Sequence, residues 1–285
     1  MYEFLLLLTL IWLIIASIRD LKIREIPNWL SFSLIISALA FRAFYSVINS
    51  VPQFFIQGIF GLAIFIILGY LFYYGRIFAG VDAKLLMALG PIIPLSNNFF
   101  YNLLLFGIFI FLVLMLGGLY GLFFSLILSI KKRKEFFKEF AIQLKKNKKL
   151  IIFFSFFAFL IFIFSLFISD IFLIITSLLF LIFPLLFIYS KAIEESCMVK
   201  EIKGKELRIG DWLYKEVEVG KRKIKPNWEG LNEKEIKLLR KKRKVKIKEG
   251  IPFVPAFLLA YIFFIILWYS SWIRWQILNL FFLFS

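Results

Sequence analysis

Residues 98–130, NFFYNLLLFGIFIFLVLMLGGLYGLFFSLILSI, run for 33 positions without an Asp, Glu, Lys or Arg. A helix needs roughly 20 apolar residues to cross a bilayer, so this stretch can cross with a tilt. The cluster KKRK follows at once, at 131–134. An uncharged run that ends in a cluster of cations is typical of a membrane helix that emerges on the cytosolic side. This stretch therefore predicts a helical membrane protein.

The composition of the whole chain agrees with that prediction. The sequence has 285 residues, is 62% hydrophobic and has a mean hydropathy of +0.89, whereas soluble domains are close to half apolar. The first apolar run has neither a basic start nor a small-residue cleavage site, so we expect it to be retained. Eight hydrophobic segments are predicted, at residues 2–18, 28–47, 52–74, 83–96, 98–130, 150–169, 171–190 and 251–283.

The basic residues give the orientation. Of the 35 Lys and Arg residues, 33 fall in the connections 19–27, 75–84, 131–149 and 191–250, and none falls near 48–51, 97 or 170. Because Lys and Arg collect on the cytosolic side, these four connections are predicted to be cytosolic. The N-terminus is predicted to lie outside, and the protein to be a multi-pass protein of the cell membrane.

The fourth segment is the irregular one. Residues 83–96 would span roughly 21 Å as a helix, which is short of the hydrocarbon core, and Gly90, Pro91 and Pro94 interrupt them. If this segment did not cross, the cluster 131–134 would lie outside. The sequence therefore predicts an irregular crossing that neighbouring helices shield.

The predicted fold class is an all-α polytopic membrane protein of about eight transmembrane helices with a small cytosolic α+β domain. In the small domain, residues 206–220 alternate as a strand does, residues 244–250 favour a second strand, and Asn232 with Glu235 favours a capped helix. The predicted parts are membrane helices one to five over 1–130, a basic cytosolic loop over 131–149, a membrane hairpin turned at Asp170 over 150–190, the small domain over 191–250, and a last membrane helix over 251–285.

Charge and residue types narrow the function classes. The net charge is +17, but the positive-inside pattern and attraction to anionic membrane lipids explain it, so we expect no nucleic-acid partner. There is one cysteine, and there is no histidine. This excludes a disulfide within the chain and argues against zinc, haem and histidine-based triads. We expect no metal and no cofactor.

Two aspartates stand out near the cytosolic surface. Asp20 lies at the end of the first segment and Asp82 just before the fourth, so two crossings separate them and both face the same side. Acidic residues close to the hydrocarbon generally mark function. A pair of carboxyl groups that shares one proton can activate water to hydrolyse an amide. From composition and topology alone, ordinary charged loop residues or an ion pathway remain alternatives.

Residues around the two aspartates either contribute to the aspartate site or have an ordinary structural role. Lys22 and Lys84 either tune the pair or only follow the positive-inside rule. Pro27 and Asn28 are expected to end the first helix and cap the second, and Gly80 allows a close backbone approach or an unusual φ.

The motifs DLKIREIPN at 20–28 and AGVDAKL at 79–85, together with GIPFVPAF at 250–257, resemble the type IV prepilin peptidase family, in its archaeal prepilin and preflagellin peptidase branch. The resemblance implies a GxGD-type membrane aspartic protease with Asp20 and Asp82 as catalytic residues. It implies cleavage, on the cytosolic side, of the short basic leader of pilin-like or flagellin-like precursors. It also implies that Pro252, Pro255 and Ala256 either shape the substrate site or only begin the last helix.

The chain departs from the family pattern in one place. The family has G-x-G-D before its second aspartate, whereas this chain has Ala79-Gly80-Val81-Asp82, and a β-branched Val81 resists positive φ. The cysteine-rich segment that accompanies methyl transfer in many bacterial members is absent, so we expect peptidase activity without N-methylation. The alternatives from other classes are an ion-coupled transporter or channel that uses the same aspartates, and a scaffold that binds pilin-like helices without cutting them. The oligomeric state stays open.

Overall fold

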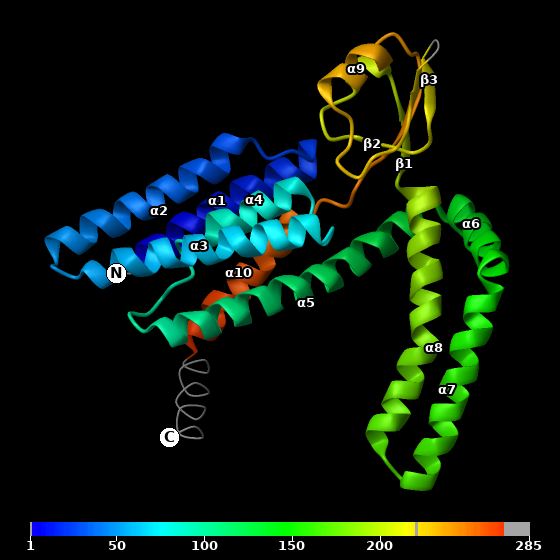
Figure 1. The fold of residues 1–285 in the computed structure, drawn as a ribbon, viewed down its shortest axis with the longest axis horizontal. Helices are drawn as coiled ribbons and strands as arrows, with labels where there is room; N and C mark the ends of the chain where they lie inside the picture. Colours follow the sequence, from blue (N-terminus) through cyan, green and yellow to red (C-terminus); the bar gives the residue numbers. More distant parts are fainter. Residues whose placement is uncertain (1, 220–221, 271–285) are drawn as a thin grey trace. The chain divides into compact units, whose positions relative to one another are not determined.

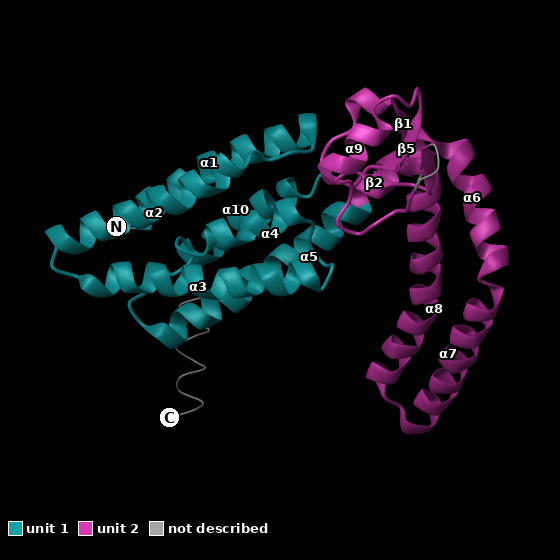
Figure 2. Cartoon of the chain, turned by 45° about the horizontal axis from the view of Figure 1, so that its top comes forward, with its two compact units in different colours: residues 1–122, 252–285 teal, residues 123–251 magenta. Residues whose placement is uncertain are grey.

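The computed structural model describes residues 2–219 and 222–270 and is mostly helical. The chain divides into two compact units, residues 1–122 with 252–285 and residues 123–251 (Figure 2). Within the described residues, six helices are long and apolar enough to cross a membrane. The predicted class is confirmed: this is a multi-pass helical membrane protein with a small domain.

The first unit contains most of the predicted membrane segments (Figure 1). Its helices are α1 (Tyr2–Ile23), α2 (Asn28–Ile48), α3 (Pro52–Tyr74), α4 (Gly80–Leu89), the first part of α5 (Phe99–Lys131) and α10 (Val254–Tyr269). The predicted segments 2–18, 28–47, 52–74 and 98–130 agree with α1, α2, α3 and α5. The last predicted segment, 251–283, begins as α10, and its residues from 271 onward lie outside the described residues.

The fourth segment is irregular, as predicted. Its helix α4 has only ten residues, and all residues from 89 to 95 are buried. The segment runs antiparallel to α3, because a Cβ on Gly69 would meet Met87 and one on Gly61 would meet the Gly90 carbonyl. Nearer the start of α3, the Gln57 side chain donates to the backbone carbonyl of Asn97, which follows Pro94, at 3.3 Å. The non-helical backbone is thus enclosed by protein, which is the condition for irregular structure at membrane depth.

Arg42 of α2 satisfies the backbone that the broken segment leaves open. Its guanidinium donates to the carbonyl oxygens of Pro91 at 2.6 Å and Phe54 at 2.7 Å, and also to those of Pro94 and Ile92. The side chain is fully buried. Carbonyl dipoles therefore take the place of a carboxylate partner for this cation.

Gly61 gives a first testable expectation. We expect Gly61→Ala to lower stability by about 1–3 kcal/mol, since its Cβ would lie 2.2 Å from the Gly90 carbonyl oxygen, so backbone must move. The measurement is thermal unfolding in detergent. Gly107→Ala on α5 is the control, because its Cβ would meet nothing within 4 Å. If the two variants were equally stable, the close packing of α3 on the broken segment would be wrong.

The second unit begins with the end of α5 and continues through α6 (Arg133–Lys146), α7 (Lys148–Ile168) and α8 (Ile171–Ala192), which ends in a π-helical turn, Ile193–Cys197. The helices α7 and α8 are joined at Asp170, whose side chain caps α8 by accepting from the Phe172 amide at 2.8 Å. That this pair of helices lies in the membrane stays a prediction. Most of the predicted basic connection 131–149 is the helix α6, and its cytosolic location stays a prediction. Phe136 and Phe140 stand four apart and share one face of α6, and the Phe136 ring packs against Tyr189 of α8.

The small domain is α+β, as predicted. The strands β1 (Val199–Ile202), β5 (Val245–Lys248) and β2 (Trp212–Leu213) form an antiparallel sheet in that order, and β3 (Val217–Val219) pairs with β4 (Arg222–Ile224). The helix α9 (Glu233–Leu239) begins with the predicted capping box, in which Asn232 and Glu235 exchange side-chain and backbone hydrogen bonds at 3.0 Å. The predicted strand 206–220 is divided into β2 and β3.

Candidate active site

Asp20 lies in the last turn of α1 and points toward α10. Its side chain is nearly buried, with 5% of the residue exposed. Its Oδ2 atom accepts a hydrogen bond of 3.0 Å from the backbone N–H of Val254, the first residue of α10. The Asp20 carbonyl accepts from the amide of Arg24, which closes the helix at φ +58°. The carboxylate is therefore held by a segment 234 positions away in the chain.

Asp82 lies in the first turn of α4. Ala79 precedes the helix in an extended conformation, its carbonyl accepts from the Ala83 amide at 3.0 Å, and its own amide donates to the Asp82 carboxyl. Asp82 is only partly exposed. Burial, and after it the negative charge of Asp20, raise the pKa of the Asp82 carboxyl to about 7, although the hydrogen bond from the Ala79 amide opposes the rise.

The two aspartates act on each other electrostatically. The charge of Asp20 is one of the causes of the raised pKa of Asp82, so the two carboxyl groups lie within range of mutual repulsion. Groups coupled in this way titrate as a pair. The helices α1 and α4 thus place the two residues that sequence reasoning selected within electrostatic range of each other, although 62 positions separate them in the chain.

The turn before Asp82 differs from the expectation. Gly80 has no positive φ, and a Cβ on it would meet only the Tyr73 ring, at an ordinary 3.5 Å. The structure uses neither the unusual φ nor the close approach that a glycine permits. Val81 lies inside the helix with negative φ, so its β-branch meets no conflict here. Because α4 starts at Gly80, the backbone at position 81 has a helical conformation that does not require glycine.

Lys84 and Asn28 connect the two motifs. The Lys84 ammonium donates to the Asn28 side-chain oxygen at 2.9 Å, which joins α4 to the start of α2. The prediction that Asn28 caps the second helix is wrong. Pro27 occupies the cap position of α2, and Asn28 is the first residue of that helix. Lys22 is exposed at the end of α1.

Because the Lys84–Asn28 bond fixes α4 against the turn that follows Asp20, we expect Lys84→Met to lower the rate of any reaction that depends on both aspartates about three- to tenfold, with a melting temperature close to the parent's. Asn28→Ala should have the same effect, and the double variant should be no worse than either single one. Lys22→Met removes the same charge without this bond and serves as the control. Additive losses in the double variant would show that the two residues act separately.

The start of α10 contains the third motif. Pro252 is buried, Pro255 is the second helical residue, and Ala256 is fully buried. Packing accounts for these three residues, and a role in shaping the substrate site stays a prediction.

Sequence reasoning missed the groups that hold Asp20. The Val254 donor is a backbone amide, which any residue type except proline supplies, so no sequence pattern signals it. Tyr120 of α5 also lies within electrostatic range of Asp20. A tyrosine in an apolar helix resembles the other aromatic residues of this chain and gives no separate signal.

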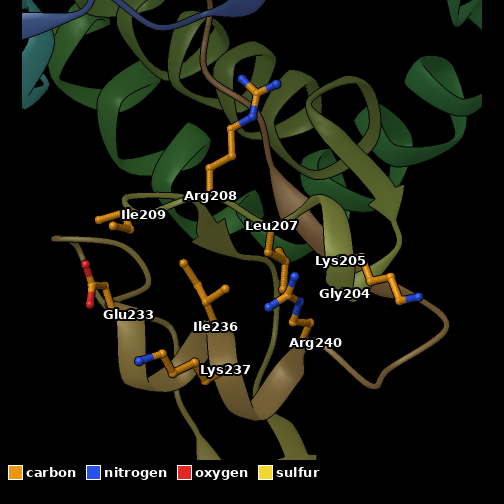
Figure 3. A pocket seen from close by; sticks show the side chains of 9 residues that line it. All are labelled: Gly204, Lys205, Leu207, Arg208, Ile209, Glu233, Ile236, Lys237 and Arg240. Carbon is orange, nitrogen blue, oxygen red and sulfur yellow. The ribbon is translucent and has the colours of Figure 1, made fainter.

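A pocket of about 370 Å³ lies elsewhere, between residues 204–209 and α9 of the small domain (Figure 3). It includes neither aspartate. Its basic side chains do not converge: Arg208 and Lys205 point away from Ile236, which lines the pocket. The pocket therefore gives no competing candidate for the site.

Comparison with known proteins agrees with the two motifs. Residues 7–129, which include both aspartates, match the type IV leader peptidase family. A preflagellin peptidase of Methanocaldococcus jannaschii is 38% identical over 87 residues, and one of Methanococcus voltae is 36% identical over 85 residues. Each match covers 30% of this chain, and the matches cover only 37% and 36% of the two relatives. No solved structure matches the chain.

These findings define the class of the protein: a polytopic membrane protein with a pair of interacting aspartates at the ends of two helices. The resemblance to the type IV prepilin peptidase family is confirmed, over residues 7–129. The small domain and α10 lie outside that matched region.

Proposed function

We propose that this protein is a membrane aspartic endopeptidase that removes the short basic leader from type IV pilin-like or flagellin-like precursors. The observation that carries the proposal is the pair Asp20 and Asp82, which lies within the family match and whose charges interact. The two curated relatives are named preflagellin peptidases, which supports the same substrate class. The ion-transport alternative has no comparable support.

The chemistry follows from one shared proton. The ionised carboxylate takes a proton from a water molecule as the water oxygen attacks the scissile carbonyl carbon, and the protonated carboxyl group donates a hydrogen bond to the carbonyl oxygen. When the tetrahedral intermediate collapses, the C–N bond breaks and the leaving amine receives a proton from the pair. Water supplies the oxygen of the new carboxylate, and the two aspartates return to their starting state with one proton between them.

The position of the aspartates suits this substrate. We place the site at the cytosolic surface of the cell membrane, with the N-terminus outside, because the connections that carry Lys and Arg are those beside Asp20 and Asp82. The apolar helix of a precursor would lie in the membrane against the first unit. Its leader junction would then reach the surface at the depth of the two carboxyl groups.

The raised pKa of Asp82 predicts the pH dependence. Below about pH 7 Asp82 keeps its proton and can donate to the carbonyl oxygen; above that value both carboxyl groups are ionised and the donor is lost. We expect turnover to fall about tenfold for each unit as pH rises above about 7. Initial rates on one precursor at constant ionic strength measure this, and a rate that stays flat over two units above neutrality would contradict the assignment.

One experiment separates this function from its rivals. Purified protein in detergent is mixed with a precursor that has a basic leader and an apolar helix. Two shorter products are expected, the larger with an unmethylated N-terminus. An intact precursor retained by the immobilised protein would indicate a scaffold, and ion flux in liposomes without cleavage would indicate a transporter.

A further inference from the structure

The first turn of α10 contacts both aspartate-bearing segments. Its Val254 amide donates to Asp20 at 3.0 Å. One residue earlier, the Phe253 ring packs against Phe78, which precedes Asp82 by four positions, with ring centroids 5.6 Å apart. Farther along α10, the Tyr261 hydroxyl donates to the Leu6 carbonyl at 3.1 Å, so α10 runs antiparallel to α1 and its first turn lies at the Asp20 end.

The surroundings of the two carboxyl groups are unequal. Burial disfavours the ionised form of both carboxyl groups. At Asp20 it is opposed by backbone hydrogen bonds from Val254 and Phe253, at the positive end of a helix, and by the cation of Arg24. Asp82 receives one amide donor, from Ala79, and faces the negative charge of Asp20. Tyr120 on α5 is a further titratable group that senses Asp20. The first turn of α10 contributes no ionisable side chain, only its amides.

We propose that the first turn of α10 is the positioning element of the site: it holds Asp20 in place as the ionised carboxylate that takes the proton from water, and leaves Asp82 as the protonated partner. This proposal rests on the proposed function for the role of the pair in catalysis. The ionisation order of the two carboxyl groups is a property of the protein alone and can be measured without a substrate.

Gly117 of α5 keeps the turn in place. A Cβ on Gly117 would lie 2.4 Å from the Cζ atom of the Phe253 ring, so the ring occupies the space that the glycine leaves. A Cβ on the neighbouring Gly118 would meet nothing within 4 Å. The ring is held on its other sides by Phe78 and by Phe257, at 5.6 and 5.8 Å. An alanine at 117 must therefore displace the Phe253 ring. Because Phe78 and Phe257 pack against the same ring, we expect the shift to reach the backbone at Phe253 and Val254, whose amides donate to Asp20.

The test compares Gly117→Ala with Gly118→Ala. The two changes add the same methyl group to the same helix with the same gain in helix propensity, so only the contact with Phe253 differs. Infrared difference spectra across a pH titration follow the carboxyl bands, and Asp20→Asn identifies the band of Asp20. We expect Asp20 to ionise before Asp82 in the parent protein. In Gly117→Ala the midpoint of Asp20 should rise by about half a pH unit or more, while Gly118→Ala leaves it in place.

Turnover gives a second measurement. Gly117→Ala should lower the turnover of a precursor between about ten- and a hundredfold, with KM little changed. The acidic limb of its pH–rate profile should move to higher pH. Phe253→Leu, which removes the ring contact with Phe78 without adding bulk, should shift Asp20 in the same direction. If Gly117→Ala does not fold, Phe253→Leu takes its place in the comparison with Gly118→Ala.

The proposal is overturned if Asp82 ionises before Asp20, or if Asp20 titrates at the same pH in Gly117→Ala, Phe253→Leu and Gly118→Ala. If instead the shift is present but the parent protein cleaves no precursor, the proposed function fails and the positioning of Asp20 by α10 stands.

Discussion

Asp20→Asn and Asp82→Asn are each expected to lower the rate of precursor cleavage by at least about 10³-fold. Asparagine keeps the shape of the side chain but cannot take a proton from water or hold the shared proton. The interaction between the two charges means that each carboxyl group depends on the other. The double variant should therefore be no slower than the slower single variant, since a pair that acts as a unit is lost with its first member.

Asp170→Asn is the matched control. Asp170 lies outside the matched region 7–129 and caps α8 through an oxygen that an asparagine also has. Its turnover should equal that of the parent protein. Retention of more than about a tenth of the parent rate by either Asp20→Asn or Asp82→Asn would rule out the paired-aspartate chemistry.

Arg42→Met should produce the largest loss of stability, about 3–5 kcal/mol. The guanidinium donates to carbonyl oxygens of Pro91, Pro94 and Phe54 in a site closed to solvent. Methionine fills part of the volume but leaves those oxygens without donors at membrane depth, where no water replaces the lost bonds. Arg42→Lys keeps the charge but not the planar fork, so its loss should be intermediate.

Unfolding in detergent measures this effect, with Arg19→Met as the control. Arg19 undergoes the same chemical change in α1, and its Nε atom has no hydrogen-bond partner among residues 2–219 and 222–270. If Arg42→Met unfolded at the same temperature as Arg19→Met, the broken segment would be held by something other than Arg42.

The sequence was sufficient for those parts of the fold that local patterns determine. The run 98–130 and the charge-bounded segments before it predicted α1, α2, α3 and α5, because helices that cross a bilayer need long apolar runs. The capping box of Asn232 and Glu235 is equally local and was confirmed. The helix α6 within the basic connection 131–149 was not predicted, because the charge density there obscured the spacing of Phe136 and Phe140.

What could not be predicted depends on partners distant in the chain. The sequence indicated that residues 83–96 are interrupted, but the donor that shields them is a lone arginine of α2 whose acceptors are carbonyl groups. At the site, Asp20 and Asp82 could be selected from their residue type and position. Their different surroundings could not, because they arise from amides of α10 and from a ring contact to Phe78.

The most direct test of the central claim is the mass of both products after purified protein is incubated with a precursor. Paired aspartates at the membrane surface predict a single cut at the junction between the basic leader and the apolar helix, with both fragments recovered in equal amounts. A cut inside the apolar helix, cuts at several unrelated positions, or a precursor of unchanged mass would contradict it.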